Sequence, residues 1–188
     1  MEVLTKEEVF SHKDKIKKEI LKGAIFIYPT DTIYGIGCNA LDDRAIFRIR
    51  ELKNREEKPF SVIAPSKKWI LDNCMITDEN WLNNLPGPYT FVMELKKKKA
   101  VSKNVNPGIK TLGVRIPNNW FSDFVEYLGV PVVTTSVNKT GEIYMTSLED
   151  CDNDIKHNVN YIFYEGEKKG KPSTLVIFGK DKIEVRER

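Results

Sequence analysis

Short, unbroken apolar runs recur along this chain of 188 residues, and they limit the folds that it can adopt. Such runs are typical of strands covered on both faces, as in sheets flanked by helices. Segments with helical periodicity lie between them, so strands and helices alternate. We therefore expect an α/β fold with a twisted, mixed, largely parallel open sheet and flanking helices. The expected strands are 24–28, 60–64, 90–95, 111–116, 130–135, 161–165, 173–178 and 183–186.

Capping residues locate the helices between these strands. Thr5 and Glu8 form a capping-box pattern and Gly23 is a suitable stop, which predicts a helix over 6–22. The order of elements shows no internal repeat, so we expect a single domain over 1–188. Similar signals predict helices that begin at Asp42 or Asp43, at Ser66 and at Thr77, and one that carries Trp120, Phe121, Phe124, Val125 and Leu128 before Gly129.

Charge and cysteine content exclude several classes of protein. The 30 Lys and Arg residues oppose 27 Asp and Glu, and a net charge of +3 is low for a dedicated nucleic-acid-binding domain. Three cysteines without a C-x-x-C pair suit neither a disulfide framework nor a zinc site, so we expect no metal ligands. The charged N-terminus lacks the apolar core of a signal peptide, and no run approaches ~18 apolar residues. We therefore expect a cytoplasmic protein with no membrane partner.

Polar and cationic residues gather near the ends of the expected strands. Thr30 and Thr32 follow 24–28, and Arg115 lies near the end of 111–116. In open α/β sheets ligands bind beyond the carboxyl ends of strands, so these residues predict one anion-binding site. Each residue alone has a second interpretation, as a cation at a helix end or a hydroxyl in a turn. The same tally includes Lys53, Arg55 and Lys58 before 60–64, and Ser136 and Asn138 after 130–135.

Four other motifs suggest different chemistry. The segment GIGCNA (35–40) matches a dinucleotide fingerprint, but several residues separate it from the preceding strand and the next helix. The segment GEKKGKPST (166–174) imitates a P-loop with the wrong glycine spacing and a proline after its lysine. His12 and His157 have no nucleophile motif nearby, which disfavours a catalytic triad. Lys96–Lys99 is most simply a solvated turn, with contact to RNA phosphates as the alternative.

Six segments together resemble the YrdC family, the threonylcarbamoyl-AMP synthases, in order and approximate spacing. They are YPTDTIYGIGCNAL, KNR with a following KPF, PGPYTFVMEL, GIKTLGVRIP, TTSVN and KPSTLV. The resemblance covers nearly the whole chain. It implies the short form of the family, with one YrdC-like domain and a concave, positively charged cavity. It also implies that L-threonine, bicarbonate and ATP give threonylcarbamoyl-AMP and pyrophosphate, for modification of the adenosine beside the anticodon of ANN-decoding tRNAs.

The resemblance also implies roles for individual residues. The carbamate of threonine is itself the nucleophile, so the protein's task is positioning and charge neutralisation. Gly35 and Gly37 are expected to let the backbone turn tightly beside the PTDT hydroxyls. The residues expected to act in catalysis are Lys53, Arg55, Ser136 and Asn138. ATP is expected to contact these four together with Lys58, Thr111 and Arg186. L-Threonine is expected to contact Thr32, Arg115, Thr134 and Ser173.

The implied cofactor is Mg²⁺ bound with ATP. The implied partners are a downstream threonylcarbamoyl transferase and, weakly, tRNA or double-stranded RNA. Two departures from the family pattern bear on these roles. Glu56 and Glu57 follow K-x-R where proline is common, and Val137 replaces the usual alanine of S-x-N. A YciO-like paralogue that binds nucleotide or RNA without making the adenylate is one alternative function, and a structural or regulatory domain is another.

Overall fold

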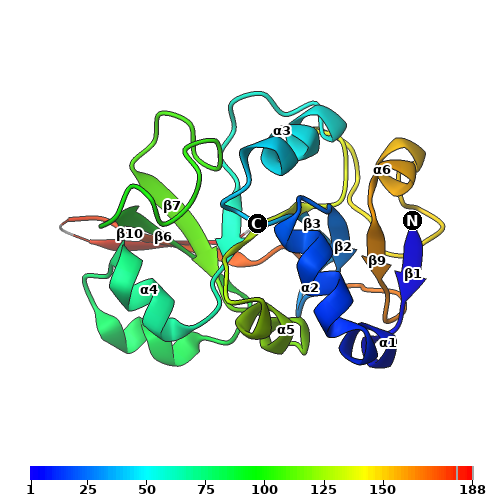
Figure 1. The fold of residues 1–188 in the computed structure, drawn as a ribbon. Helices are drawn as coiled ribbons and strands as arrows, with labels where there is room; N and C mark the ends of the chain where they lie inside the picture. The colour runs from blue at the N-terminus through cyan, green and yellow to red at the C-terminus, as the bar shows by residue number, and fades with distance from the viewer. Residues whose placement is uncertain (181, 188) are drawn as a thin grey trace.

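A strongly twisted sheet forms the centre of the molecule, and helices cover it on both sides (Figure 1). The computed structural model describes residues 1–180 and 182–187. Within these residues the sheet has 11 strands in the order β1-β9-β2-β3-β8-β4-β7-β6-β10-β11, with β5 paired to β6. The strands are β1 (Glu2–Leu4), β2 (Phe26–Tyr28), β3 (Gly35–Gly37), β4 (Ser61–Ile63), β5 (Cys74–Met75), β6 (Tyr89–Leu95), β7 (Thr111–Arg115), β8 (Val132–Ser136), β9 (Tyr161–Phe163), β10 (Thr174–Phe178) and β11 (Ile183–Arg186).

The helices begin and end at the kinds of residue that cap helices. Asp42 accepts a hydrogen bond from Ala45 N, Ser66 accepts one from Trp69 N, and Gly129 ends its helix in the left-handed conformation. These three predicted boundaries are confirmed. The helices are α1 (Lys6–Ser11), α2 (Lys13–Leu21), α3 (Asp43–Leu52), α4 (Lys67–Asn73), the 3-10 helix η1 (Glu79–Asn84), α5 (Phe121–Leu128) and α6 (Asn153–Asn158).

The pairing of the strands is mixed, and the expectation of a largely parallel sheet is wrong. Four strand pairs are parallel: β1 with β9, β2 with β9, β4 with β7, and β6 with β10. The central strand β8 runs antiparallel to both of its neighbours, β3 and β4. The short hairpin from β2 into β3 and the hairpin from β10 into β11 add further antiparallel pairs. Hairpins of this kind need only short connections, which the apolar runs alone do not reveal.

Gly35 and Gly37 lie in strand β3 and not in a tight turn, which corrects the sequence-based expectation. A Cβ on Gly35 would stand 2.9 Å from the Tyr28 ring, and one on Gly37 would overlap the carbonyl oxygen of Val133. The glycines therefore let neighbouring groups approach closely, a common reason for glycine inside a strand. The turn lies before them, in the segment 29–34 that carries the PTDT hydroxyls.

Two other local predictions are also wrong in detail. The predicted helix 6–22 is divided at His12, which ends α1 and precedes α2. Asp78, and not Thr77, caps the helix that follows β5, since its carboxylate accepts a hydrogen bond from Asn80 N. The strands β1, β3 and β5 and the helix α6 have no counterpart in the prediction, because each is short.

Two apolar clusters pack on opposite faces of the sheet and leave one area of it uncovered. On one face Ile27, Val62 and Val114 join residues of α3 and α4. On the other face Ile63 and Val132 join residues of α2 and α5. Along β4 and β8, alternation places Ser61 and Thr134 on this second face too, two residues beyond the part that α5 covers. The uncovered area is where the cavity opens.

Candidate functional site

A cavity of about 370 Å³ lies over this uncovered face, above β6, β7, β4 and β8. It brings together segments that are far apart in the sequence. Hydroxyl groups and two arginines dominate its polar lining, and among the described residues that line it there is no aspartate or glutamate. The lining residues are Thr30, Ile33, Tyr34, Gly35, Arg55, Pro59, Phe60, Ser61, Thr90, Val92, Thr111, Gly113, Arg115, Thr134, Thr135, Ser136, Tyr144, Pro172, Ser173 and Leu175.

The register of the strands arranges the cavity floor in three rows. Ser61 is directly opposite Gly113 of β7 and Thr134 of β8, which forms the middle row. Two residues along, the same face carries Thr111 and Ser136, and Arg115 lies two residues along in the other direction. Because two residues of a strand advance by about 6.6 Å, the two outer rows are about 13 Å apart. Thr111 and Ser136, which are predicted to contact ATP, thus lie at one end of the floor. Arg115, which is predicted to contact threonine, lies at the other end.

Arg115 forms a buried ion pair that the sequence analysis did not foresee. One terminal nitrogen donates to Asp31 Oδ1 at 2.5 Å, and both terminal nitrogens lie 3.3 Å from the hydroxyl of Thr32. Asp31 also accepts a hydrogen bond from the backbone N–H of Asn118. Burial lowers the pKa of Arg115, and the charge of Asp31 opposes that shift. The Nε of Arg115 is buried and has no hydrogen-bond partner within the described residues, so the N–H at this atom is unused.

The PTDT segment combines a local turn with a contact to the cavity. The hydroxyl of Thr30 donates to Ile33 O at 2.7 Å and lies 2.9 Å from the hydroxyl of Thr32. These are the bonds of a hydroxyl-stabilised turn, so the plain structural interpretation of this segment is partly correct. Thr30 also lines the cavity, whereas Thr32 lies behind the lining, where its hydroxyl contacts the lining residues Thr30 and Arg115.

Lys53 lies behind the cavity and not in its lining. Its ammonium donates to the backbone oxygens of Ser136 and Asn138 at 2.6 and 2.5 Å, and to Asn138 Oδ1 at 3.2 Å. Ser136 Oγ in turn donates to Asn138 Oδ1 at 2.6 Å. Burial, with a smaller effect from the charge of Arg55, lowers the pKa of Lys53 to about 7. The structure therefore brings K-x-R and S-x-N into direct contact, with Lys53 holding the backbone of the second motif.

Arg55 is the member of K-x-R that lines the cavity. Its guanidinium donates to Pro59 O at 2.7 Å and stands 5.1 Å from the centre of the Phe60 ring. Thr135 Oγ1 is 3.5 Å from its other terminal nitrogen. These contacts hold the planar group without neutralising its charge, which suits a site for phosphate. Burial and the charge of Arg50 lower the pKa of Arg55.

Four predicted ATP residues stand outside the lining: Lys53 and Asn138, which contact each other behind it, and Lys58 and Arg186. Lys58 is exposed, and its backbone oxygen accepts hydrogen bonds from Arg50 and Arg55. Among the described residues no hydrogen bond involves its side chain. Arg186 is exposed on β11, opposite Leu175, and pairs with Glu184 at 2.6 Å. Ser173 does line the cavity, with its hydroxyl 2.7 Å from that of Thr90. Thr30, which the sequence placed in the anion-binding site, also lines the cavity, whereas the lining hydroxyls of Tyr34, Ser61, Thr90, Thr135 and Tyr144 were not assigned from the sequence, since only register or a loop contact reveals them.

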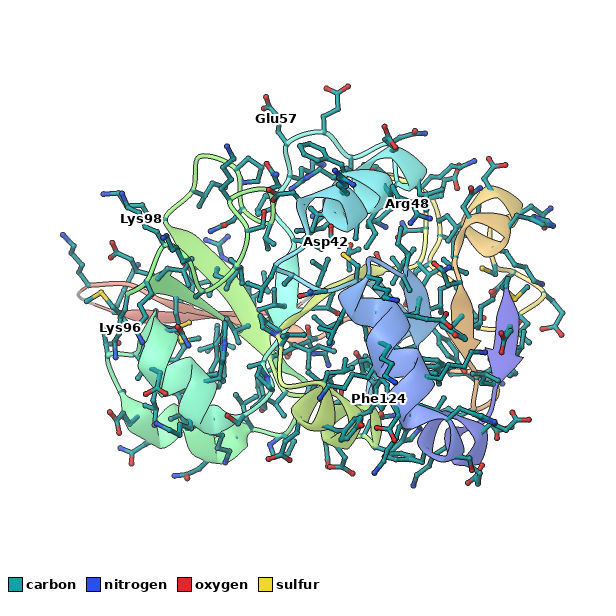
Figure 2. The ribbon with its side chains drawn as sticks, in the orientation of Figure 1. Asp42, Arg48, Glu57, Lys96, Lys98 and Phe124 are labelled. Atoms are coloured by element: carbon teal, nitrogen blue, oxygen red, sulfur yellow. The ribbon has the colours of Figure 1, made fainter. Side chains whose placement is uncertain are left out.

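The remaining motifs have structural explanations. GIGCNA is strand β3 followed by an isolated bridge at Asn39 and a turn, and the segment from Gly166 to Pro172 has no helix after its lysines. Each histidine ring contacts a backbone oxygen four residues earlier, and neither ring lines the cavity. Lys96–Lys99 forms a turn at the edge of the molecule, where Lys96 and Lys98 are labelled in Figure 2.

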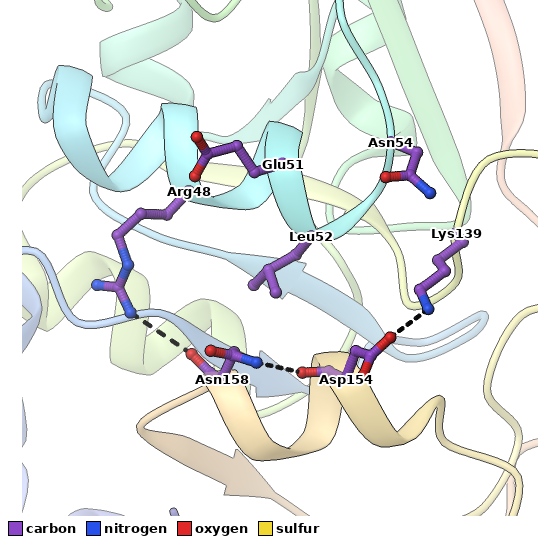
Figure 3. A pocket seen from close by; sticks show the side chains of 7 residues that line it. All are labelled: Arg48, Glu51, Leu52, Asn54, Lys139, Asp154 and Asn158. Atoms are coloured by element: carbon purple, nitrogen blue, oxygen red, sulfur yellow. Dashed lines mark hydrogen bonds and ion pairs between the residues drawn. The ribbon is translucent and has the colours of Figure 1, made fainter.

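A second hollow, of about 420 Å³, lies between α3 and α6 and is also lined by residues beside the K-x-R and S-x-N motifs (Figure 3). Asn54 of K-x-R and Lys139 after S-x-N both line it. Lys139 pairs with Asp154 at 2.5 Å and with Asp152 at 3.3 Å, so its charge is matched within the chain.

Among residues 1–180 and 182–187 there is no group of three His, Cys, Asp or Glu side chains suited to a metal ion. In the same residues no helix has the length and apolar character that crossing a bilayer requires.

The fold and the cavity together define an α/β protein with a cavity lined by hydroxyl groups and two arginines. Residues 18–188 match the Sua5_yciO_yrdC family, which is described as "Telomere recombination", and the chain belongs to this family. A Methanocaldococcus jannaschii protein named "Putative threonylcarbamoyl-AMP synthase" is 35% identical over 96% of this chain and 86% of its own length. The mouse threonylcarbamoyl-AMP synthase is 33% identical over 70% of this chain, and that match spans only 48% of the mouse protein.

Solved structures show the same fold. P. abyssi Sua5, determined as a complex with L-threonine, has a TM-score of 0.86 and 24% identity, over 98% of this chain and 56% of that one. E. coli YciO has a TM-score of 0.83 and 24% identity, over 99% of this chain and 94% of its own. Identities this low support the fold alone.

Proposed function

We propose that this protein is an L-threonylcarbamoyladenylate synthase. The ammonium group of threonine loses a proton to solvent, and the resulting amine attacks the carbon of bicarbonate to form a carbamate with release of water. A carbamate oxygen then attacks the α-phosphorus of ATP, the bond from that phosphorus to the bridging oxygen breaks, and pyrophosphate leaves. The product would serve a downstream threonylcarbamoyl transferase that modifies tRNA, with weak contact to tRNA or double-stranded RNA and a cytoplasmic location as further expectations.

One observation carries the proposal: a single cavity floor has Arg55, Thr111 and Ser136 at one end and Arg115 at the other. Bidentate donors such as guanidinium groups recognise both phosphates and carboxylates. The separation of the two arginines therefore provides one end for a triphosphate and another for an amino-acid carboxylate. The names of the relatives, and the L-threonine bound to P. abyssi Sua5, support the choice of these ligands.

Positioning is the main contribution of the residues in this mechanism. Arg55 and Ser136 would contact the phosphates, and Lys53 would hold the backbone at Ser136 and Asn138 in place. Arg115 and Thr32 would bind threonine, with Thr134 and Ser173 adding hydroxyl contacts. Because the lining offers no carboxylate, Mg²⁺ would enter with ATP and be held by phosphate oxygens and water. Lys58 and Arg186 would reach ATP only after their side chains move.

The test is release of pyrophosphate by the purified protein when ATP, L-threonine and bicarbonate are supplied singly, in pairs and together. We expect release only with all three, and an adenylate product of the corresponding mass. Preparations free of bicarbonate, made by degassing, provide the control for contaminating ATPases. Release that is independent of threonine would contradict the proposal.

A YciO-like function is the alternative, and one observation favours it. Glu56 and Glu57 follow K-x-R, and both are exposed, with Glu57 projecting outward in Figure 2. Acidic groups near Arg55 would weaken its attraction for a triphosphate. On this alternative the protein binds nucleotide in calorimetry but forms no adenylate. The variant Glu56→Pro would then also form none. Recovery of synthesis in that variant would instead place the protein among the synthases.

A further inference from the structure

Ser61 is the hydroxyl at the centre of the cavity floor. It lies on β4 between Gly113 and Thr134, in the middle of the three rows, and it lines the cavity. Its side chain is half-buried, and its Oγ has no hydrogen-bond partner within residues 1–180 and 182–187. Ser61 is therefore a donor and acceptor that the folded chain leaves available at the midpoint of the site.

Gly113 keeps the space beside this hydroxyl open. A Cβ at position 113 would overlap Ser61 Oγ, and would stand 3.1 Å from Ser61 Cβ and 3.3 Å from Thr90 Cγ2. Glycine inside a strand costs stability, and it commonly marks a place where another group must approach the backbone. Here the group that approaches is the Ser61 side chain, so the hydroxyl and the gap beside it form one feature.

The chemistry of the product identifies what belongs at this midpoint. In threonylcarbamoyl-AMP the carbon from bicarbonate is joined to the threonine nitrogen on one side and, through one oxygen, to the α-phosphorus on the other. A site that holds threonine at the Arg115 row and phosphates at the Thr111 row must therefore hold this carboxyl group between them. The Ser61 row is about 6.6 Å from each outer row.

We propose that Ser61, together with the hydroxyl of Thr134 and the gap above Gly113, binds the carboxyl group that bicarbonate contributes. This inference rests on the proposed function. The hydroxyl of Ser61 donates to a carboxylate oxygen and so orients the carbamate toward the α-phosphorus. Serine provides one donor on a short side chain, which leaves room for a planar group of three atoms.

The test measures the bicarbonate dependence of pyrophosphate release in Ser61→Ala, at saturating ATP and L-threonine. Loss of a hydrogen bond to a charged group predicts a rise of about tenfold or more in the apparent KM for bicarbonate. The Kd values for ATP and L-threonine, measured separately by calorimetry, should stay within about twofold of wild type. Gly113→Ala, which displaces Ser61 Oγ, should shift the bicarbonate KM in the same direction. Ser11→Ala, at an exposed position of α1, is the matched control and should change none of these values.

The outcomes separate this inference from the proposed function. If the wild-type protein shows no threonine- and bicarbonate-dependent release, both the function and the subsite are refuted. If the wild type is active and Ser61→Ala keeps the wild-type KM for bicarbonate, only the subsite is refuted. A tenfold loss of ATP affinity with unchanged bicarbonate KM would assign Ser61 to the phosphates, and the same loss for threonine would assign it to the amino acid. Either result would also overturn the carboxyl subsite.

Discussion

Replacement of Arg115 by alanine tests the structure most directly, because the buried ion pair with Asp31 was not foreseen. The two side chains are 6% and 11% exposed, and their closest atoms are 2.5 Å apart. In Arg115→Ala the carboxylate of Asp31 keeps only the hydrogen bond from Asn118 N–H and loses its buried counter-charge. We therefore expect Arg115→Ala to destabilise the fold as well as to impair binding of threonine.

The expected magnitude follows from the burial of the pair. Removal of one partner of a buried ion pair costs about 3–5 kcal/mol, because the other charge is left uncompensated. That is a large share of the roughly 5–15 kcal/mol by which domains are stable. The double variant Arg115→Ala/Asp31→Asn removes the orphaned charge, so its loss should be smaller than the sum of the two single losses by about 1–3 kcal/mol.

Urea unfolding, followed by tryptophan fluorescence, measures these free energies for the wild type, both single variants and the double variant. Arg48→Ala is the matched control, since Arg48 is exposed and its two contacts are 3.4 and 3.5 Å long. It should lie within about 0.5 kcal/mol of wild type. The argument from burial would be refuted if the two single losses of unfolding free energy added up to the loss in the double variant. It would also be refuted if Arg115→Ala were as stable as the control.

Two further variants test the phosphate end of the site. Arg55→Ala should weaken ATP binding by about 1.5–3 kcal/mol, the usual range for a hydrogen bond to a charged group, with an unchanged unfolding free energy; equal ATP affinities in calorimetry would remove Arg55 from the site. The pKa of Lys53 is lowered to about 7 in the folded protein, so between about pH 7 and its ordinary value of 10.5 the unfolded chain binds more protons. Stability of the wild type relative to Lys53→Met should therefore rise with pH across that window, and a difference that does not vary with pH in urea unfolding would contradict the buried position of Lys53.

The sequence was sufficient for features that depend on local signals. Asp42, Ser66 and Gly129 mark helix ends because caps act within one turn, and the longer apolar runs are strands because burial on both faces requires them. The direction of β8 was not predictable, since it depends on which neighbours a strand finds in the folded sheet. The same limit explains why the sheet is mixed although its strands and helices largely alternate.

The candidate site shows the same division between local and long-range information. Motifs placed Arg55, Ser136 and Arg115 near one another, and the structure brings all three to one cavity. The position of Lys53 behind the S-x-N backbone depends on contacts 83 and 85 residues apart, which no local pattern contains. Ser61 was missed for a related reason: only the register of three strands places it between the two ends of the floor.

The ion pair also changes what the Arg115 end of the cavity offers to threonine, the ligand that the family resemblance implies there. An unpaired guanidinium at the end of an apolar strand would need an anionic ligand, but Asp31 supplies that charge from within the chain. What remains for a ligand is an end of the cavity where the charge of Arg115 is neutralised, whereas Arg55 at the other end has no acidic partner among the described residues. On the proposed function this difference separates the substrates by charge. A highly anionic triphosphate is attracted to the Arg55 end, and threonine, whose own charges balance, can bind beside the Arg115–Asp31 pair without leaving either charge uncompensated.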